Sequence, residues 1–240
     1  MHHFLKKLAV PAIAALPSTA LAEDWSFAAS VYLFTPETET TVGDVGSTLS
    51  FKEALENLDA AFMGTFEARR GRWSLVGDYM LTDLSFGNSV SNPNFDTVNT
   101  TAKTEFFSGY ATYRVYQEST ASVDLAAGFR WFKTDTELVA LSGGTDVARA
   151  GASDSWVDPV IGLRAEFALT DRWSGLFFAD YGGFSSDSET WQVLVTANYA
   201  LSEKWMLRAG YRQISVDHDI NGRGFTFEQS GPIFGAVFSF

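Results

Sequence analysis

A tight polar turn, then a tryptophan, then a run of alternating residues that reaches a tyrosine occurs three times in this chain. Successive side chains of a β-strand point to opposite faces, so each run places small and apolar residues on the tryptophan face and its charged residues on the other face. The pattern predicts strands that separate an apolar environment from a polar one. The aromatic residues that mark it are Trp73, Tyr79, Trp173, Tyr181, Trp205 and Tyr211.

The tryptophan and the tyrosine of each run are six or eight residues apart. In strands that rise about 3.3 Å per residue and tilt by about 40°, this separation is roughly 15 to 20 Å along a barrel axis. Two aromatic girdles on either side of an apolar band fit that spacing. We therefore expect the tryptophan face to contact lipid, with these six residues forming the membrane girdles.

The connections between the expected strands alternate in length. Tight turns (RRGR, YQES, LTDR and LSEK) alternate with longer polar segments, and short turns at one end with long loops at the other are typical of outer-membrane β-barrels. The longer segments are residues 37–59, 87–102, 135–155, 183–189 and 217–225.

The sequence predicts an all-β fold, a closed antiparallel up-and-down transmembrane β-barrel of about ten strands. Closure of an even number of strands leaves no backbone group unpaired in lipid. Eight strands is the alternative, because the first strand and the segment 50–58 carry the weakest strand pattern. That segment has Phe51, Leu55 and Leu58 at helical spacing, so we expect a short helix in the first long loop. The strands are expected at 25–35, 60–69, 72–86, 103–116, 120–133, 156–169, 172–182, 189–201, 204–216 and 226–240.

The first 22 residues have the pattern of a secretory signal peptide. Lys6 and Lys7 precede an apolar stretch, and Ala20 and Ala22 supply the small residues of a cleavage site. We expect a leader at 1–22 and one barrel domain at 23–240. Without the two leader lysines, the 17 Lys and Arg fall to 15 against 29 Asp and Glu, a formal charge of −14, which disfavours nucleic acid as a partner. The chain has no cysteine, so no disulfide contributes to stability.

The faces opposite the tryptophans carry six positive and six negative side chains. A barrel of eight to ten strands has a lumen that side chains nearly fill. Unpaired charges there would be costly, whereas interleaved opposite charges are tolerated. The arrangement predicts a charge-paired core that closes the lumen; the alternative is a narrow path for ions or small solutes. The residues are Glu67, Arg69, Asp78, Arg114, Asp124, Arg130, Asp158, Arg164, Glu166, Asp180, Arg208 and Arg212.

The leader, the alternating strands, the tryptophan after each tight turn and a closing strand that ends in phenylalanine resemble small OmpA-type, porin-like outer-membrane β-barrel proteins. The resemblance implies a location in the outer membrane, contact with the lipid bilayer and lipopolysaccharide, and recognition of the last strand by the barrel-assembly machinery. The residues at the matching positions of that strand are Phe234, Phe238 and Phe240. This chain stops at the barrel, so the cell-wall anchoring of some members is not expected.

His218, between Asp217 and Asp219, is the one candidate for catalysis. A histidine oriented by a carboxylate is a common general base. The Asp-His pair at an expected barrel rim looks similar to that of omptin-type outer-membrane proteases, with Asp83 and Ser85 as positional candidates for the facing groups. The alternative is a solvated loop histidine. The acidic long segments could bridge to lipopolysaccharide through divalent cations, but no metal-binding motif is present and no cofactor is expected.

The leading hypothesis is a non-enzymatic outer-membrane barrel with a narrow or closed lumen. It would serve envelope structure or surface interaction, with at most slow passage of small solutes. The alternatives are a rim enzyme, omptin-like or lipid-modifying, that uses His218, and a soluble exported barrel that binds an apolar ligand in its lumen. The sequence does not identify a small-molecule ligand.

Overall fold

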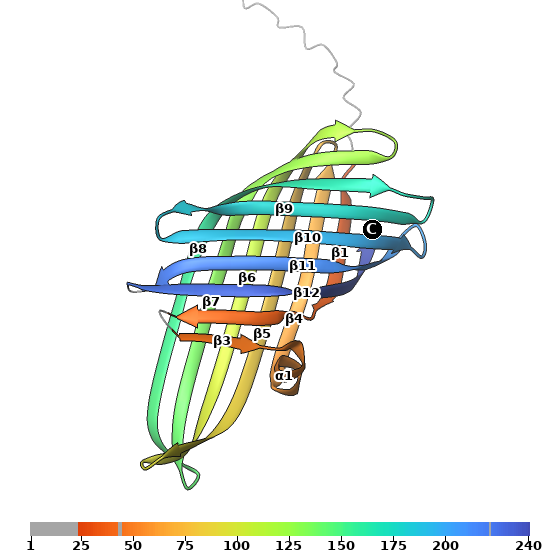
Figure 1. The fold of residues 1–240 in the computed structure, drawn as a ribbon. Coiled ribbons are helices and arrows are strands. Elements are labelled where there is room, and N and C mark those ends of the chain that lie inside the picture. The colour runs from red at the N-terminus through yellow and green to blue at the C-terminus, as the bar shows by residue number, and fades with distance from the viewer. Residues whose placement is uncertain (1–23, 43–44, 221) are drawn as a thin grey trace, which may run out of the picture.

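The computed structural model describes residues 24–42, 45–220 and 222–240, so the expected leader at 1–22 lies outside the described residues. Nearly all of the described chain is antiparallel strand (Figure 1). No helix in these ranges is long and apolar enough to cross a membrane. The elements are β1 (Ser26–Phe34), β2 (Glu37–Val42), β3 (Val45–Leu49), α1 (Phe51–Glu56), β4 (Leu58–Arg70), β5 (Trp73–Asn92), β6 (Phe95–Gln117), β7 (Ala121–Ser142), β8 (Thr145–Ala168), β9 (Trp173–Ser185), β10 (Ser188–Ala200), β11 (Trp205–Ile220) and β12 (Arg223–Ser239).

Ten of the strands close into a ring. β1 pairs with β4 on one side and with β12 on the other, and each strand from β4 to β12 pairs with the next. The prediction of a closed antiparallel up-and-down barrel is confirmed, and the ring has the expected ten strands. Two further strands extend the sheet: β2 pairs with residues 225–230 of β12, beyond the end of β1, and β3 pairs with β2. The prediction of a long loop at 37–59 is wrong for this hairpin.

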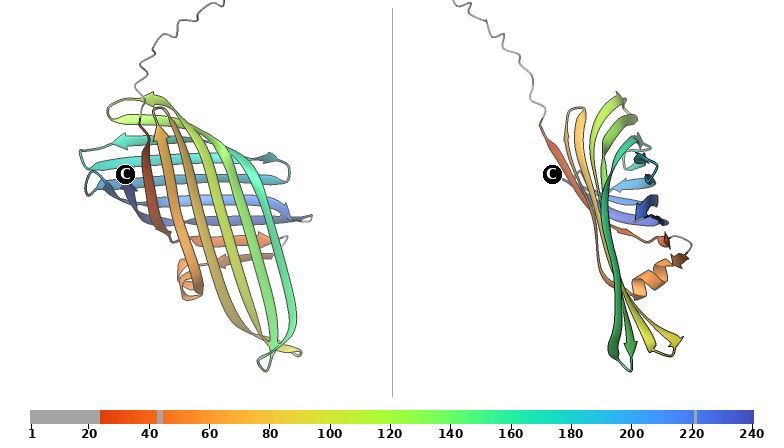
Figure 2. Two further views of the ribbon diagram at one scale, coloured as in Figure 1. Left: turned by 180° about the vertical axis from the view of Figure 1, so that it is seen from behind. Right: turned by 90° about the vertical axis from the view of Figure 1, so that its left-hand side faces the viewer.

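The strands β5 to β8 are longer than predicted. They have 20, 23, 22 and 24 residues, and they extend beyond the ring as one wall (Figure 2). The interpretation of 87–102 and 135–155 as loops was therefore wrong. Beyond the apolar band both faces of a strand meet polar surroundings, so alternation no longer marks the strand. Residues of opposite charge are register neighbours on adjacent strands there, with Lys103 between Asp83 and Asp135. We call this end of the ring the outer end, and the opposite end the turn end.

The predicted short helix is confirmed as α1. Ser50 is its N-cap, and its side chain accepts a hydrogen bond from the Glu53 amide while the Glu53 carboxylate accepts from the Ser50 amide. This reciprocal capping box satisfies backbone amide donors that the first turn of a helix otherwise leaves without a partner. The helix stands beside the β2–β3 hairpin at the outer end of the ring (Figure 1).

Candidate functional site

A layer of aromatic rings crosses the lumen at its outer end. Phe34, Phe106, Phe132, Phe225 and Phe227, which we call the aromatic layer, come from the four strands β1, β6, β7 and β12 and are each at most 5% exposed. The Phe132 ring lies 6.2 Å from the Phe106 ring, 6.0 Å from the Phe225 ring and 5.2 Å from the Phe227 ring. Rings at these centroid distances pack as in a protein core. The outer end of the lumen is therefore filled by apolar side chains.

Two buried arginine–carboxylate pairs lie directly below the aromatic layer. Arg130 contacts Asp180 at 2.8 Å, and Arg212 contacts Asp78 at 2.8 Å. Gln192 joins the pairs, because its amide nitrogen donates to Asp180 and its amide oxygen accepts from Arg212. Both guanidinium groups also face the ring of Phe106, at 5.1 and 5.7 Å, so the network and the aromatic layer form one packed unit.

A second network fills the turn end of the lumen. Asp124 accepts hydrogen bonds from Arg69 and Arg114, each at 2.7 Å. Glu67 accepts from Arg164 at 2.7 Å and also pairs with Arg69. The network continues from Arg164 to Glu166, while Arg208 donates to Asn198 at 2.9 Å. A cavity of about 110 Å³ lies between the two networks.

Every residue of the predicted lumen set has a polar partner. Asp158, which belongs to neither network, accepts a hydrogen bond from Ser188 at 2.6 Å. Ten of the twelve residues have an ion-pair partner, whereas Asp158 and Arg208 are hydrogen-bonded to the neutral side chains of Ser188 and Asn198; such partners reduce the cost of burying charge.

The predicted girdle residues lie on the outside of the ring. Trp73, Trp173 and Trp205 are 59%, 48% and 49% exposed, at the turn end of β5, β9 and β11. Tyr181 and Tyr211 are also exposed, nearer the outer end. Tyr79 donates a hydrogen bond to Glu105 at 3.0 Å.

Phe238 and Phe240 close the ring at the turn end, whereas Phe234 lies nearer the outer end, opposite Leu33. The rings of Phe238 and Trp205 pack 4.9 Å apart, and the Phe240 amide donates to the Phe27 carbonyl at 3.0 Å. Phe234 and Phe240 are exposed on the outside of the barrel.

His218 points into the lumen, away from its acidic neighbours. Its ring stacks on the Trp156 ring at 4.1 Å beside the aromatic layer. Asp217 accepts a hydrogen bond from Thr226, and Asp219 accepts from the Gly222 amide, so neither carboxylate orients the imidazole. Asp83 and Ser85 lie on the outward face of β5 and do not face the histidine either. Their neighbours include Asp59, which accepts from Ser85.

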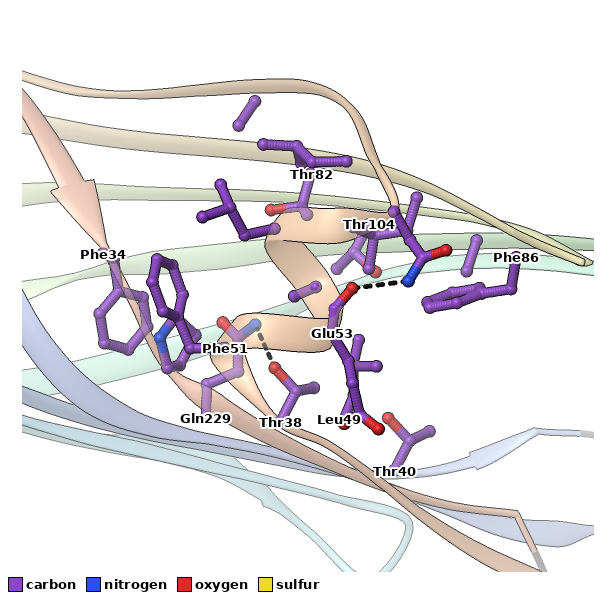
Figure 3. Close-up of a pocket in the computed structure, with 18 of the residues that line it drawn as sticks. Phe34, Thr38, Thr40, Leu49, Phe51, Glu53, Thr82, Phe86, Thr104 and Gln229 are labelled. Atoms are coloured by element: carbon purple, nitrogen blue, oxygen red, sulfur yellow. Dashed lines mark hydrogen bonds between the residues drawn. The ribbon is translucent and has the colours of Figure 1, made fainter.

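A pocket of about 600 Å³ opens at the outer end, between α1, the β2–β3 hairpin and the wall of β5 and β6 (Figure 3). Its floor is shared with the aromatic layer through Phe34 and Phe227, and its back is formed by Leu84, Phe86 and Ala102. The volume is within the usual range of small-molecule sites. The pocket could not be predicted from the sequence, because many of its lining residues lie in segments 37–59 and 87–102, which were expected to be loops.

The cap of α1 gives one edge of this pocket a pH dependence. Hydrogen bonds from the Ser50 hydroxyl and amide hold the pKa of the Glu53 carboxyl below its usual range. A lowered pKa stabilises the cap at neutral pH, and this contribution disappears as the pH falls through the pKa of the folded state. We expect Ser50→Ala to lower the amide protection factors in α1 roughly fivefold at neutral pH, and acidification to lower the same protection factors in the wild type once the slower intrinsic exchange at low pH is divided out. Hydrogen exchange with mass spectrometry measures both, and Lys52→Ala, which breaks an exposed pair with Glu56 and leaves the hydrogen bonds between Ser50 and Glu53 in place, is the control.

Comparison with solved structures identifies the architecture. The outer membrane protease OmpT from Escherichia coli matches over 91% of this chain and 97% of its own length, with 12% identity and a TM-score of 0.55. The fold is that of an outer-membrane β-barrel. The attachment invasion locus protein Ail of Yersinia pestis (13% identity, 91% and 99% coverage, TM-score 0.43) and Neisserial surface protein A (16% identity, 90% and 97% coverage, TM-score 0.35) also match. No protein-family model and no curated protein sequence matches the chain.

Proposed function

We propose that this chain is a non-enzymatic and non-conducting barrel of the outer membrane, with a role in envelope structure or surface interaction. The observation that supports this function is the filling of the lumen. The aromatic layer crosses its outer end, and two hydrogen-bonded charge networks lie below that layer. Ions that entered from either end would meet side chains that are already packed or paired.

The location in the membrane is supported by the outside of the ring. The exposed tryptophans at the turn end and the exposed Tyr181 and Tyr211 nearer the outer end border a band of apolar side chains. Lys103 and Lys133 lie just beyond that band, where both pair with Glu105. Lysines at this height suit contact with the phosphate groups of lipopolysaccharide. Phe234, Phe238 and Phe240 are proposed as the signal that the barrel-assembly machinery reads.

Planar bilayer recordings test the closed lumen. The purified barrel, inserted in a bilayer at high salt, is expected to give no discrete conductance steps, because the packed aromatic layer and the Arg130 network lie across the lumen. A general porin inserted under the same conditions provides the positive control, and heat-modifiable migration in detergent confirms that the barrel is folded. Reproducible steps from the folded protein would refute the closed-lumen proposal.

A further inference from the structure

The wall of the barrel is interrupted directly above β1. This strand ends at Phe34, whereas its neighbour β12 continues outward and pairs with β2 instead. The strand order ends at β3, which among the described residues pairs with β2 alone. On the other side of the gap β4 starts at Leu58, opposite Leu84 of β5. The helix α1 and the 600 Å³ pocket occupy this gap (Figure 3).

The gap lies at the outer edge of the membrane band. Leu33 is opposite Phe234 in the register. Phe234 is two residues along β12 from Pro232, which is opposite Tyr211. Leu58 pairs just beyond Asp83, where the outward face of β5 turns polar. The pocket therefore spans the height at which hydrocarbon gives way to lipid headgroups.

The lip of the pocket continues the lipid-facing surface. Leu33, Leu55 and Leu58 line the pocket and are 51%, 56% and 36% exposed. Below them on β1 and β4, Val31 and Phe62 are 61% and 53% exposed toward lipid. An apolar chain can pass from the bilayer over these side chains into the pocket without crossing water.

The lining suits a ligand whose buried part carries no charge. Among the described residues the lining contains no lysine, arginine or histidine, and its one ionisable side chain, Glu53, is bonded to Ser50. Phe34, Met63 and Phe227 make the floor apolar, so a charged group there would stay unpaired at considerable cost. Neutral hydrogen-bonding groups come from Thr38, Thr40, Thr82, Thr100, Thr104, Asn57 and Gln229.

We infer that this pocket binds the alkyl chain of an uncharged or zwitterionic amphiphile through the gap between β3 and β4. The threonine hydroxyl groups can donate hydrogen bonds to an ester or an alcohol oxygen, and they can accept a hydrogen bond from an alcohol. Because the floor of the pocket is part of the aromatic layer, the chain is held at the membrane surface and is not passed through the lumen.

Photo-crosslinking of the full barrel in phosphatidylcholine vesicles tests this inference. One arm uses a phosphatidylcholine with a diazirine on its acyl chain, and the other uses a diazirine-bearing dodecanol added from water. Mass spectrometry is expected to find saturable labelling on peptides that contain α1 and the pocket-lining parts of β5 and β6. Labelling in either arm supports the site, and the arm with the higher yield identifies the source of the chain.

Two substitutions on β6 separate the pocket from the lipid-facing wall. Ala102→Trp fills the pocket and is expected to lower the labelling about tenfold, whereas Ala111→Trp, on the lipid face of the same strand, leaves it unchanged. If the Ala102→Trp barrel does not fold, Thr100→Phe is used in its place. Dodecanol is expected to compete about tenfold better than dodecyl sulfate, because the lining offers no cation for a sulfate group. Absence of saturable labelling in both arms, equal labelling of the Ala102 and Ala111 variants, or equal competition by the two amphiphiles would overturn the inference. None of these results depends on whether the lumen conducts.

Discussion

The substitution Arg130→Met is expected to lower the free energy of unfolding of the barrel by about 3–5 kcal/mol. The Arg130 and Asp180 side chains are both 0% exposed and 2.8 Å apart, so removal of the guanidinium leaves a buried carboxylate without its countercharge. Tyr110 and Thr190 lose a donor in the same step. Urea unfolding of the barrel in phospholipid vesicles, followed by electrophoretic mobility without heating, measures the loss.

A matched pair of variants shows whether the loss of stability comes from the unpaired charge of Asp180. Arg130→Met combined with Asp180→Leu removes both charges and keeps the volume, and it is expected to recover most of the stability because buried ion pairs can be replaced by apolar side chains at little net change. Arg149→Met, which breaks exposed pairs with Glu137 and Asp146, is expected to cost less than about 1 kcal/mol. If the double variant were as unstable as the single one, the packing of the arginine and not its charge would explain the effect.

The faces of the strands could be predicted from the sequence, whereas the pairs inside the lumen could not. Alternation alone assigns Arg130 and Asp180 to the side opposite the tryptophans. Their contact spans 50 residues and two strand pairings, so it depends on the tilt and stagger of the ring, which alternation does not encode. Gln192, which links the two outer arginine pairs, carries no charge, so a pattern of opposite charges in the sequence does not identify it.

The strands at the outer end of the molecule could not be predicted from the sequence for a different reason. Alternation identifies a strand in the sequence only where one face of the strand is apolar. Beyond Asp83 and Lys103 neither face of the strands has to be apolar. The pairing of β2 with the upper half of β12 was missed too, since Glu37–Val42 is polar and threonine-rich. The α1 helix was predictable because its apolar residues have a period that strands lack. The pocket is formed by the outer parts of β5 and β6, the β2–β3 hairpin and α1 together. Prediction of α1 alone therefore could not reveal it.

The substitution Phe132→Ala is expected to cost about 3–5 kcal/mol of unfolding free energy, as for other large-to-small changes in a filled core. Phe132 is 1% exposed and packs against four aromatic rings, so the change leaves a cavity in the aromatic layer. Phe129→Ala, on the lipid side of the same strand, is expected to cost less than half as much, because lipid chains fill the vacated volume. The same urea titration in vesicles measures both variants.

Conductance of the Phe132→Ala variant then separates the two barriers in the lumen. We expect bilayers with this variant to stay silent, because the Arg130 and Arg212 pairs below the aromatic layer are untouched and still cross the lumen. A variant that is destabilised as expected yet conducts ions would show that the aromatic layer alone closes the barrel. Equal destabilisation by Phe129→Ala and Phe132→Ala would mean that the aromatic layer is not a packed core, and the physical basis of the closed lumen would then have to lie in the charge networks alone.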